Sequence, residues 1–109
     1  MSIFGFLNQA DINAGVGEYL KTEKAVLLDV RTKKEYESGH IENSENIPLQ
    51  QIDKLLAKIA DKNTPLFVYC RSGNRSKQAS QKLVGLEYTK VIEIGGILDY
   101  SGETQKGVQ

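Results

Sequence analysis

The stretch that organises the chain is Phe67-Val68-Tyr69-Cys70-Arg71-Ser72-Gly73-Asn74-Arg75-Ser76. An apolar run that begins at Leu66 ends at the only cysteine of the sequence, Cys70, and small or cationic residues follow it. Beyond them, Ala79, Leu83 and Leu86 recur at helical spacing. The pattern predicts a strand, a tight loop and a helix, with a thiol as the first residue of the loop.

A thiol at such a junction is expected to be reactive. The N–H groups of a tight loop and the positive end of a helix dipole stabilise an anion, and Arg71 and Arg75 add two cations. These surroundings favour the thiolate, which is the nucleophilic form of cysteine. The alternative is a cysteine that packs in the core as a small hydrophobic residue. A loop with a glycine and two arginines favours the reactive thiol.

Length and composition limit the class of protein. The 109 residues fit one domain, and 14 basic against 14 acidic residues leave none of the basic excess of a nucleic-acid binder. One cysteine and one histidine argue against a multi-ligand metal site. A lone thiol fits a reducing compartment, and no apolar run approaches the roughly 20 residues that span a bilayer. We therefore expect a cytoplasmic protein without membrane contact.

Strands and helices alternate along the chain. Strands are predicted at residues 25–30, 46–49, 66–70 and 91–94. Helices are predicted at residues 11–21, 33–38, 50–60, 75–84 and 97–100. The first strand is apolar almost throughout, which is typical of a strand buried on both faces. The alternation predicts an α/β fold, with a mostly parallel sheet covered by helices on both faces.

The glycines and the two ends carry further expectations. Gly39 and Gly85 are expected to end helices, Gly39 in the left-handed conformation. The pair Gly95-Gly96 is expected to break the last strand. Residues 1–10 hold apolar side chains that are expected to dock on the core. Residues 101–109 are polar and are expected to fray.

Polar groups follow two of the predicted strands. Cys70 ends one strand, and Asp29 and Arg31 close another. Ligand sites of parallel sheets lie beyond the carboxyl ends of the strands, so we expect a site at this rim. Asp29 and Arg31 are expected to support it, mainly as an architectural ion pair. His40 follows Gly39 and is expected to be a structural hydrogen-bonding residue and not a general base.

Two chemistries use a cysteine loop of this kind. Phosphoryl and arsenate chemistry uses a Cys-x5-Arg loop, but Arg75 lies five positions after Cys70, which gives Cys-x4-Arg. The loop is therefore one residue short for that pattern. The other chemistry is sulfur transfer, in which a six-residue loop holds a persulfide, and the loop from Arg71 to Ser76 has this length.

Four segments between about residues 25 and 100 match signatures of one family. They are Leu27-Leu28-Asp29-Val30-Arg31 with Glu35-Tyr36, Gly39-His40-Ile41 with Asn46-Ile47-Pro48-Leu49, the stretch from Tyr69 to Ser76, and Gly95-Gly96-Ile97 with Asp99-Tyr100. With these segments the chain resembles the single-domain rhodaneses, which are sulfurtransferases of the thiosulfate sulfurtransferase type. Each segment alone is weakly specific, and the four together are highly specific.

The resemblance implies a single domain over residues 1–109, with a five-stranded, mainly parallel sheet and helices on both faces. It implies that Cys70 is the nucleophile and carries sulfur as a persulfide. The donor's oxygens and the persulfide charge would be held by Arg71, Ser72, Gly73, Asn74, Arg75 and Ser76. Expected partners are a small sulfur donor such as thiosulfate, or a protein that carries a persulfide, and an acceptor such as cyanide or a thiol. No metal or organic cofactor is implied.

Other readings stay open at this point. They are a cysteine-dependent phosphatase or arsenate reductase, a non-catalytic rhodanese-like binding module, and a persulfide carrier in a larger pathway. Two positions depart from the family. Ser72 stands where the two-domain enzymes place a lysine, which favours a donor other than thiosulfate. Tyr100 stands where a tryptophan is common, either lining the pocket or packing against the core. The oligomeric state stays unknown.

Overall fold

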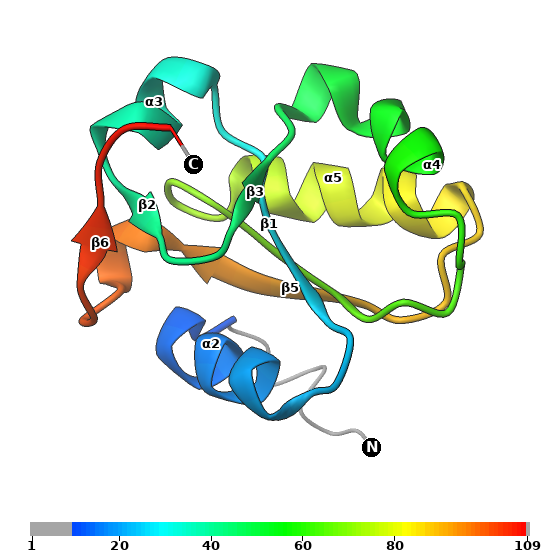
Figure 1. Ribbon diagram of the computed structural model, residues 1–109, viewed down its shortest axis with the longest axis horizontal. Helices are drawn as coiled ribbons and strands as arrows, with labels where there is room; N and C mark the ends of the chain where they lie inside the picture. Colours follow the sequence, from blue (N-terminus) through cyan, green and yellow to red (C-terminus); the bar gives the residue numbers. More distant parts are fainter. Residues whose placement is uncertain (1–9, 109) are drawn as a thin grey trace.

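The computed structural model describes residues 10–108. Its centre is a sheet of four strands that are all parallel, in the order β3-β1-β4-β5 (Figure 1). The strands are Val26–Asp29 (β1), Glu45–Asn46 (β3), Leu66–Cys70 (β4) and Val91–Gly96 (β5). The expected α/β class with a parallel sheet is confirmed, but within residues 10–108 the parallel sheet has four strands and not five.

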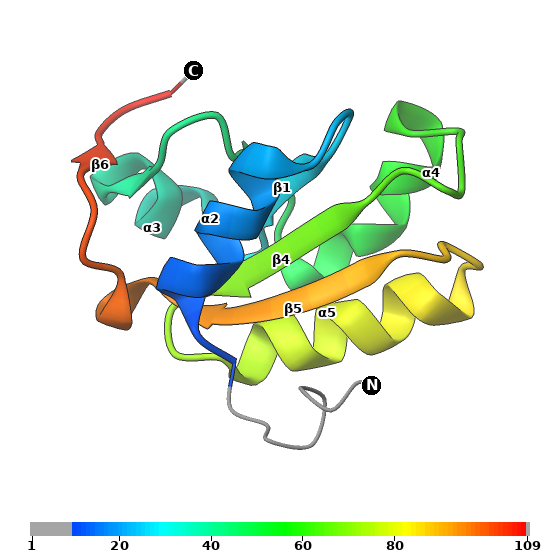
Figure 2. The ribbon, with the colours of Figure 1, turned by 90° about the horizontal axis from the view of Figure 1, so that it is seen from below.

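Helices cover both faces of this sheet. Figure 2 shows β4 and β5 lying between α2 (Ile12–Lys21) and α5 (Asn74–Gly85). A 3-10 segment (Leu49–Lys54) and the short α4 (Leu55–Lys58) lie on the same side as α5 and pack against it. The short α3 (Lys33–Ser38) follows β1. None of the helices within the described part of the chain is long and apolar enough to cross a membrane.

Alternation along β4 divides the core into two clusters. Successive side chains of a strand point to opposite faces of the sheet. Leu66, Val68 and Cys70 therefore belong to the cluster under α5, whereas Phe67 and Tyr69 belong to the cluster under α2. All five side chains are buried. A strand buried on both faces has to be apolar at successive positions, which explains the continuous apolar run.

Helix α2 lies close to the sheet because of Gly15. A Cβ atom at this position would collide with the side chain of Ile94 in β5. The N-terminus of α2 is capped by the side chain of Asp11, which accepts hydrogen bonds from the N–H groups of Asn13 and Ala14. A glycine that weakens an isolated helix thus permits the close packing of this helix on the sheet.

The helix predicted at 50–60 is different in the structure. It is a 3-10 segment from Leu49 to Lys54, with a kink at Gln51, followed by one turn of α-helix. Its buried residues Leu49, Ile52 and Leu55 are spaced by three. A spacing of three matches the three residues per turn of a 3-10 helix, and all three side chains belong to the cluster under α5. The strand predicted at 46–49 is likewise shifted to Glu45–Asn46.

The expected roles of the glycines were wrong in part. Gly39 caps α3 in an extended conformation (φ 160°), because it leads directly into β2 (His40–Ile41). Gly85 ends α5 as expected, and the left-handed residue after the helix is Glu87 (φ 76°). Gly95 and Gly96 continue β5 through a bulge, in which Gly95 has φ 103°. A glycine accepts this conformation without steric cost, so the strand continues.

The expectation of a frayed C-terminal tail was also wrong up to Gly107. Thr104–Gln105 forms β6, which pairs antiparallel with β2. The N–H of Gly107 then donates to the carbonyl of Glu37 at 2.8 Å. Backbone pairing of this kind needs no apolar side chains, so the polar composition of the tail did not reveal it. The expected docking of residues 1–10 falls outside the described residues except for Ala10.

Candidate active site

The two polar strand ends predicted from the sequence lie at one rim of the sheet. Asp29 at the end of β1 pairs in register with Tyr69 of β4. The N–H of Val30 then donates to the carbonyl of Tyr69 at 3.0 Å. Cys70 is the next residue of β4, so the thiol and the Asp29 carboxylate belong to neighbouring strand ends. The ends of β1 and β4 thus lie side by side, as expected.

Cys70 is buried, with 1% of its surface exposed, and belongs to the core cluster under α5. Its sulfur nevertheless has polar neighbours. The N–H of Gly73 donates to Sγ at 3.0 Å, and the hydroxyl of Ser76 lies 3.4 Å from Sγ. Gly73 adopts φ 111°, a left-handed conformation that suits glycine. The polar contacts distinguish Cys70 from a cysteine that only fills space.

The loop leads directly into the N-terminus of α5. Gly73 is the N-cap of this helix, and no side chain caps it. The N–H groups of Asn74, Arg75 and Ser76 lie in the first turn, where a helix offers them no carbonyl partner. Together with the helix dipole, such groups form a place for negative charge. This helix terminus follows directly on Gly73, whose N–H donates to Sγ of Cys70.

Gly96 allows the loop to lie against β5. A Cβ at Gly96 would collide with the carbonyl oxygen of Arg71 and the Cα of Ser72. The same carbonyl accepts a hydrogen bond from the N–H of Leu98 at 3.2 Å. The Gly95-Gly96 pair, which the sequence suggested as a strand breaker, therefore shapes the site by permitting this close contact.

The two loop arginines are placed differently. Arg71 is exposed, as are Ser72 and Asn74. Arg75 donates to both carboxylate oxygens of Glu35 in α3, at 2.7 and 3.0 Å. This interaction raises the pKa of Arg75, and the nearby charge of Cys70 adds to the effect. Arg75 therefore acts on the sulfur by its charge while its donors are directed to α3.

Asp29 and Arg31 form the expected architectural ion pair. Both are buried, and Nη2 of Arg31 lies 2.6 Å from Oδ2 of Asp29. Arg31 also donates to the carbonyl of Gly39 at 2.7 Å. The amide of Asn46 donates to the carbonyls of Asp29 and Arg31. These bonds hold the end of β1 beside β2 and β3 and support the rim.

The other candidates have structural contacts. His40 is 1% exposed, stacks on the ring of Tyr36 and places Nδ1 2.8 Å from the carbonyl of that residue. This fits the structural role expected for His40. Tyr100 packs against the cluster under α2, whereas the Cys70 side chain belongs to the cluster under α5. The structure therefore favours core packing for Tyr100.

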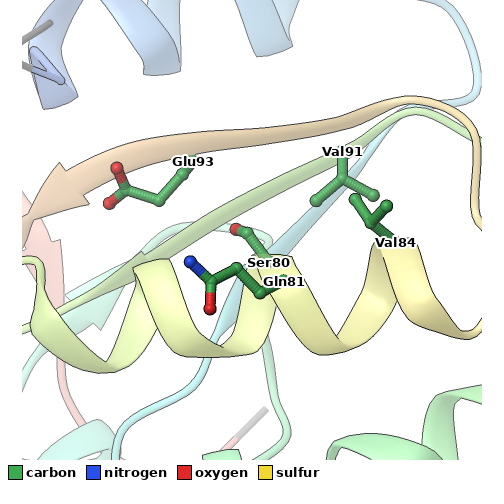
Figure 3. A pocket seen from close by; sticks show the side chains of 5 residues that line it. All are labelled: Ser80, Gln81, Val84, Val91 and Glu93. Carbon is green, nitrogen blue, oxygen red and sulfur yellow. The ribbon is translucent and has the colours of Figure 1, made fainter.

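One site residue had no sequence signal. Oε2 of Glu93 in β5 accepts a hydrogen bond from the hydroxyl of Ser76 at 2.5 Å and another from the N–H of Gly95 at 2.8 Å. Glu93 also lines an open groove between α5 and β5, whose other lining residues are Ser80, Gln81, Val84 and Val91 (Figure 3). An acidic residue within a predicted strand reads as an ordinary polar position, so only the packing of α5 on β5 reveals this contact.

Comparison with known proteins identifies the family. The sequence model of the rhodanese-like domain family matches residues 14–103. The chain therefore belongs to the rhodanese-like domain family. The thiosulfate sulfurtransferase PspE of Escherichia coli is 35% identical over 81 residues, which cover 73% of this chain and 78% of that protein. The thiosulfate sulfurtransferase GlpE of Pseudomonas savastanoi is 36% identical over 93 residues, which cover 81% of this chain and 87% of that protein.

Other relatives are longer. The putative sulfur carrier protein YrkF of Bacillus subtilis is 33% identical over 84 residues, and the match covers 45% of its length. Among solved structures, a rhodanese with anions from E. coli has a TM-score of 0.71 at 33% identity. The match covers 76% of this chain and 99% of that one. The BH2092 protein of Bacillus halodurans has a TM-score of 0.76 at 26% identity, covering 94% of this chain and 80% of that one. The fold and the family thus agree with the four sequence signatures.

Proposed function

We propose that this protein is a sulfurtransferase that moves a sulfane sulfur from thiosulfate or another persulfide donor to a thiophilic acceptor through a persulfide on Cys70. The observation that carries the proposal is the position of Sγ. It accepts the N–H of Gly73 at 3.0 Å and lies beside the uncapped N-terminus of α5. Membership of the rhodanese-like family and kinship with PspE and GlpE support sulfur transfer at the level of the family.

In the first step, the thiolate of Cys70 attacks the outer sulfur of the donor. With thiosulfate, a bond forms between Sγ and the outer sulfur, the S–S bond of thiosulfate breaks, and sulfite leaves with the electron pair. Cys70 then carries a persulfide with a negative charge on its outer sulfur. The loop amides and the dipole of α5 stabilise that charge, and the exposed Arg71 is available to the oxygens of an anionic donor.

In the second step, the acceptor removes the outer sulfur. Cyanide or a thiolate attacks this sulfur, the S–S bond of the persulfide breaks, and the electron pair returns to Sγ as a thiolate. With cyanide the product is thiocyanate. Because one transfer is divided between two half-reactions, we expect ping-pong kinetics. The burial of Cys70 suits the approach of a single sulfur atom better than that of a bulky group.

The proposal extends to the setting of the reaction. A lone free thiol that works through its thiolate fits a reducing compartment, so we propose a cytoplasmic location. The acceptor in the cell would then be a thiol, and the donor a small sulfane sulfur compound or a protein persulfide. Ser72 is exposed beside Arg71, so the mouth of the loop carries one cation. This favours a donor with less charge than thiosulfate.

Mass spectrometry tests the first step. The protein is incubated with thiosulfate or with an organic persulfide, and we expect the mass of one added sulfur atom. Cys70 is the only cysteine, so the added atom is assigned by comparison with Cys70→Ser. Thiocyanate formation from thiosulfate and cyanide tests the complete cycle, and we expect Cys70→Ser to be inactive while its circular dichroism spectrum is retained.

Two results would reject the proposal. One is the absence of added sulfur with every sulfane donor tried. The other is Cys70-dependent hydrolysis of an aryl phosphate without sulfur transfer, which would identify a phosphatase. The short Cys-x4-Arg loop and the pairing of Arg75 with Glu35 argue against phosphate chemistry. A folded protein without either activity would indicate a binding module.

A further inference from the structure

The carboxylate of Glu93 lies one hydroxyl group away from the sulfur of Cys70. Its Oε2 accepts the hydroxyl of Ser76 at 2.5 Å, and that hydroxyl lies 3.4 Å from Sγ. Figure 3 shows Glu93 with its carboxylate directed toward the carboxyl end of β5. Within residues 10–108 no arginine or lysine forms an ion pair with Glu93. Its charge is therefore balanced only by hydrogen bonds.

The hydroxyl of Ser76 has one proton and several acceptors. Besides Glu93, the carbonyls of Gly73 and Gly95 lie at 3.0 and 3.5 Å from Oγ. A hydrogen bond to a carboxylate is shorter and stronger than one to a neutral carbonyl, and 2.5 Å is the shortest of the three distances. The proton of Ser76 is thus directed to Glu93. A lone pair of Oγ then faces Sγ, so Ser76 accepts from the thiol but does not donate to the thiolate.

We infer that Glu93 is a positioning residue that acts through Ser76 and restrains the formation of the Cys70 thiolate, thereby setting the pH range in which the nucleophile is active. Two effects have the same sign. The negative charge of Glu93 opposes a second negative charge on Sγ, and the Ser76 proton is withheld from the thiolate. The inference rests on the proposed function only in taking Cys70 as the nucleophile.

Other charged groups bear on the same sulfur. Arg75 favours the thiolate by its charge, but it is paired with Glu35. Arg71 favours the thiolate from its exposed position in the loop. The remaining titratable groups on the elements packed around β5 are Tyr69 of β4, Lys77 and Lys82 of α5, Glu18, Tyr19 and Lys21 of α2, and Asp99. Within the described chain, none of these bonds to Glu93 or Ser76 through its side chain, so Glu93 is the acid coupled to the site.

The variant Glu93→Gln separates charge from structure. Both hydrogen bonds of Glu93 end on the same oxygen, Oε2, so the amide oxygen of glutamine can accept them in its place. The thiolate of the unmodified protein is titrated by its ultraviolet absorbance, with Cys70→Ser as the blank. We expect the curve of Glu93→Gln to move to lower pH by about half a unit to one unit, equal to a roughly three- to tenfold larger thiolate fraction on the acid side.

A double-mutant cycle with Ser76→Ala tests the route. If Glu93 acts through the Ser76 hydroxyl, the shift caused by Glu93→Gln falls by at least about half when residue 76 is alanine. The matched control is Glu18→Gln, an exposed carboxylate on α2. An unmoved curve, a shift to higher pH, an equal shift in Glu18→Gln, or an undiminished shift with Ser76→Ala overturns the inference.

The titration requires no sulfur donor, so the two proposals fail separately. If wild-type protein takes up no sulfur but the curve of Glu93→Gln moves as expected, the sulfurtransferase proposal is rejected and the role of Glu93 stands. If sulfur transfer occurs and the curve does not move, the role of Glu93 is rejected. In the transfer assay, at a pH below the midpoint of the Cys70 titration, we expect Glu93→Gln to carry out the first step faster than wild type.

Discussion

Arg75 donates two hydrogen bonds to the carboxylate of Glu35, at 2.7 and 3.0 Å, and thereby joins the first turn of α5 to α3. The two side chains are about 30% exposed. The resemblance to the rhodaneses implied that Arg75 holds the bound substrate, and the structure gives its guanidinium a partner within the protein. The pair holds α3 against the N-terminus of α5.

Removal of this pair makes the stability depend less on pH. The hydrogen bonds from Arg75 lower the pKa of Glu35 from its ordinary value of 4.5 to about 2. Since the pKa is lower in the folded state, the stabilisation is present above about pH 4.5 and is lost as the pH falls toward about 2. We expect Glu35→Gln to lower the free energy of unfolding by about 1 kcal/mol at neutral pH.

Urea unfolding at a series of pH values measures this effect. The difference between wild type and Glu35→Gln should shrink toward zero at about pH 2. The control is Glu42→Gln, because Glu42 is exposed and its side chain makes no hydrogen bond or ion pair within the described residues. A difference that stays constant across the acid range would show that the pair does not produce the effect.

Gly96→Ala should damage the site more than the fold. The new methyl group would collide with the backbone of Arg71 and Ser72 and push the loop away from β5. We expect a loss of about 1–3 kcal/mol in stability, as for other overpacked sites. Thiocyanate formation should fall at least about tenfold, because a loop displaced by about 1 Å misplaces the donors around the sulfur.

Gly85→Ala is the matched control for this change. Gly85 ends α5, and a Cβ there would meet nothing within 4 Å. We expect unchanged activity and unchanged or slightly higher stability. Equal activities of Gly96→Ala and wild type would show that the contact between Gly96 and the loop is dispensable for the reaction.

Asp29→Asn should destabilise the protein strongly. Arg31 would remain buried without its counterion, and the loss of one partner of a buried pair costs about 3–5 kcal/mol. The exposed pair of Lys58 and Glu45, at 3.9 Å, provides the comparison. We expect Glu45→Gln to change the unfolding free energy by less than about 0.5 kcal/mol. Similar losses in the two variants, measured by urea unfolding, would contradict the architectural role of Asp29.

Local signals in the chain predicted most of the secondary structure. Apolar runs located β1, β4 and β5, and the helices predicted at residues 11–21 and 33–38 begin within one residue of α2 and α3. The observed secondary structure differs from the prediction where backbone pairing, or a periodicity other than that of the α-helix, decides the structure. The strand β6 and the 3-10 segment at Leu49–Lys54 are the two examples.

The candidate site was predictable only in its sequence-local part. Cys70 and the loop that ends at Ser76 are contiguous, and their strand–loop–helix setting follows from residue types within a few positions. The partners from elsewhere in the chain were missed. Glu35 was noted as part of a signature without a role, and Glu93 was taken as an ordinary strand residue. Neither has a local pattern, because each contacts α5 across the fold.

The sequence by itself determined the class of fold and the position of the nucleophile. The periodicity of strands and helices and the loop around Cys70 depend only on residues that are neighbours in the sequence. The tertiary structure decided which charges surround that sulfur. It paired Arg75 with Glu35 and placed Glu93 behind Ser76. Electrostatic interactions depend on distances in space. Arg75 and Glu35 are separated by 40 positions in the sequence, and Ser76 and Glu93 by 17 positions. Each pair comes within hydrogen-bonding distance only when the sheet and α5 have packed.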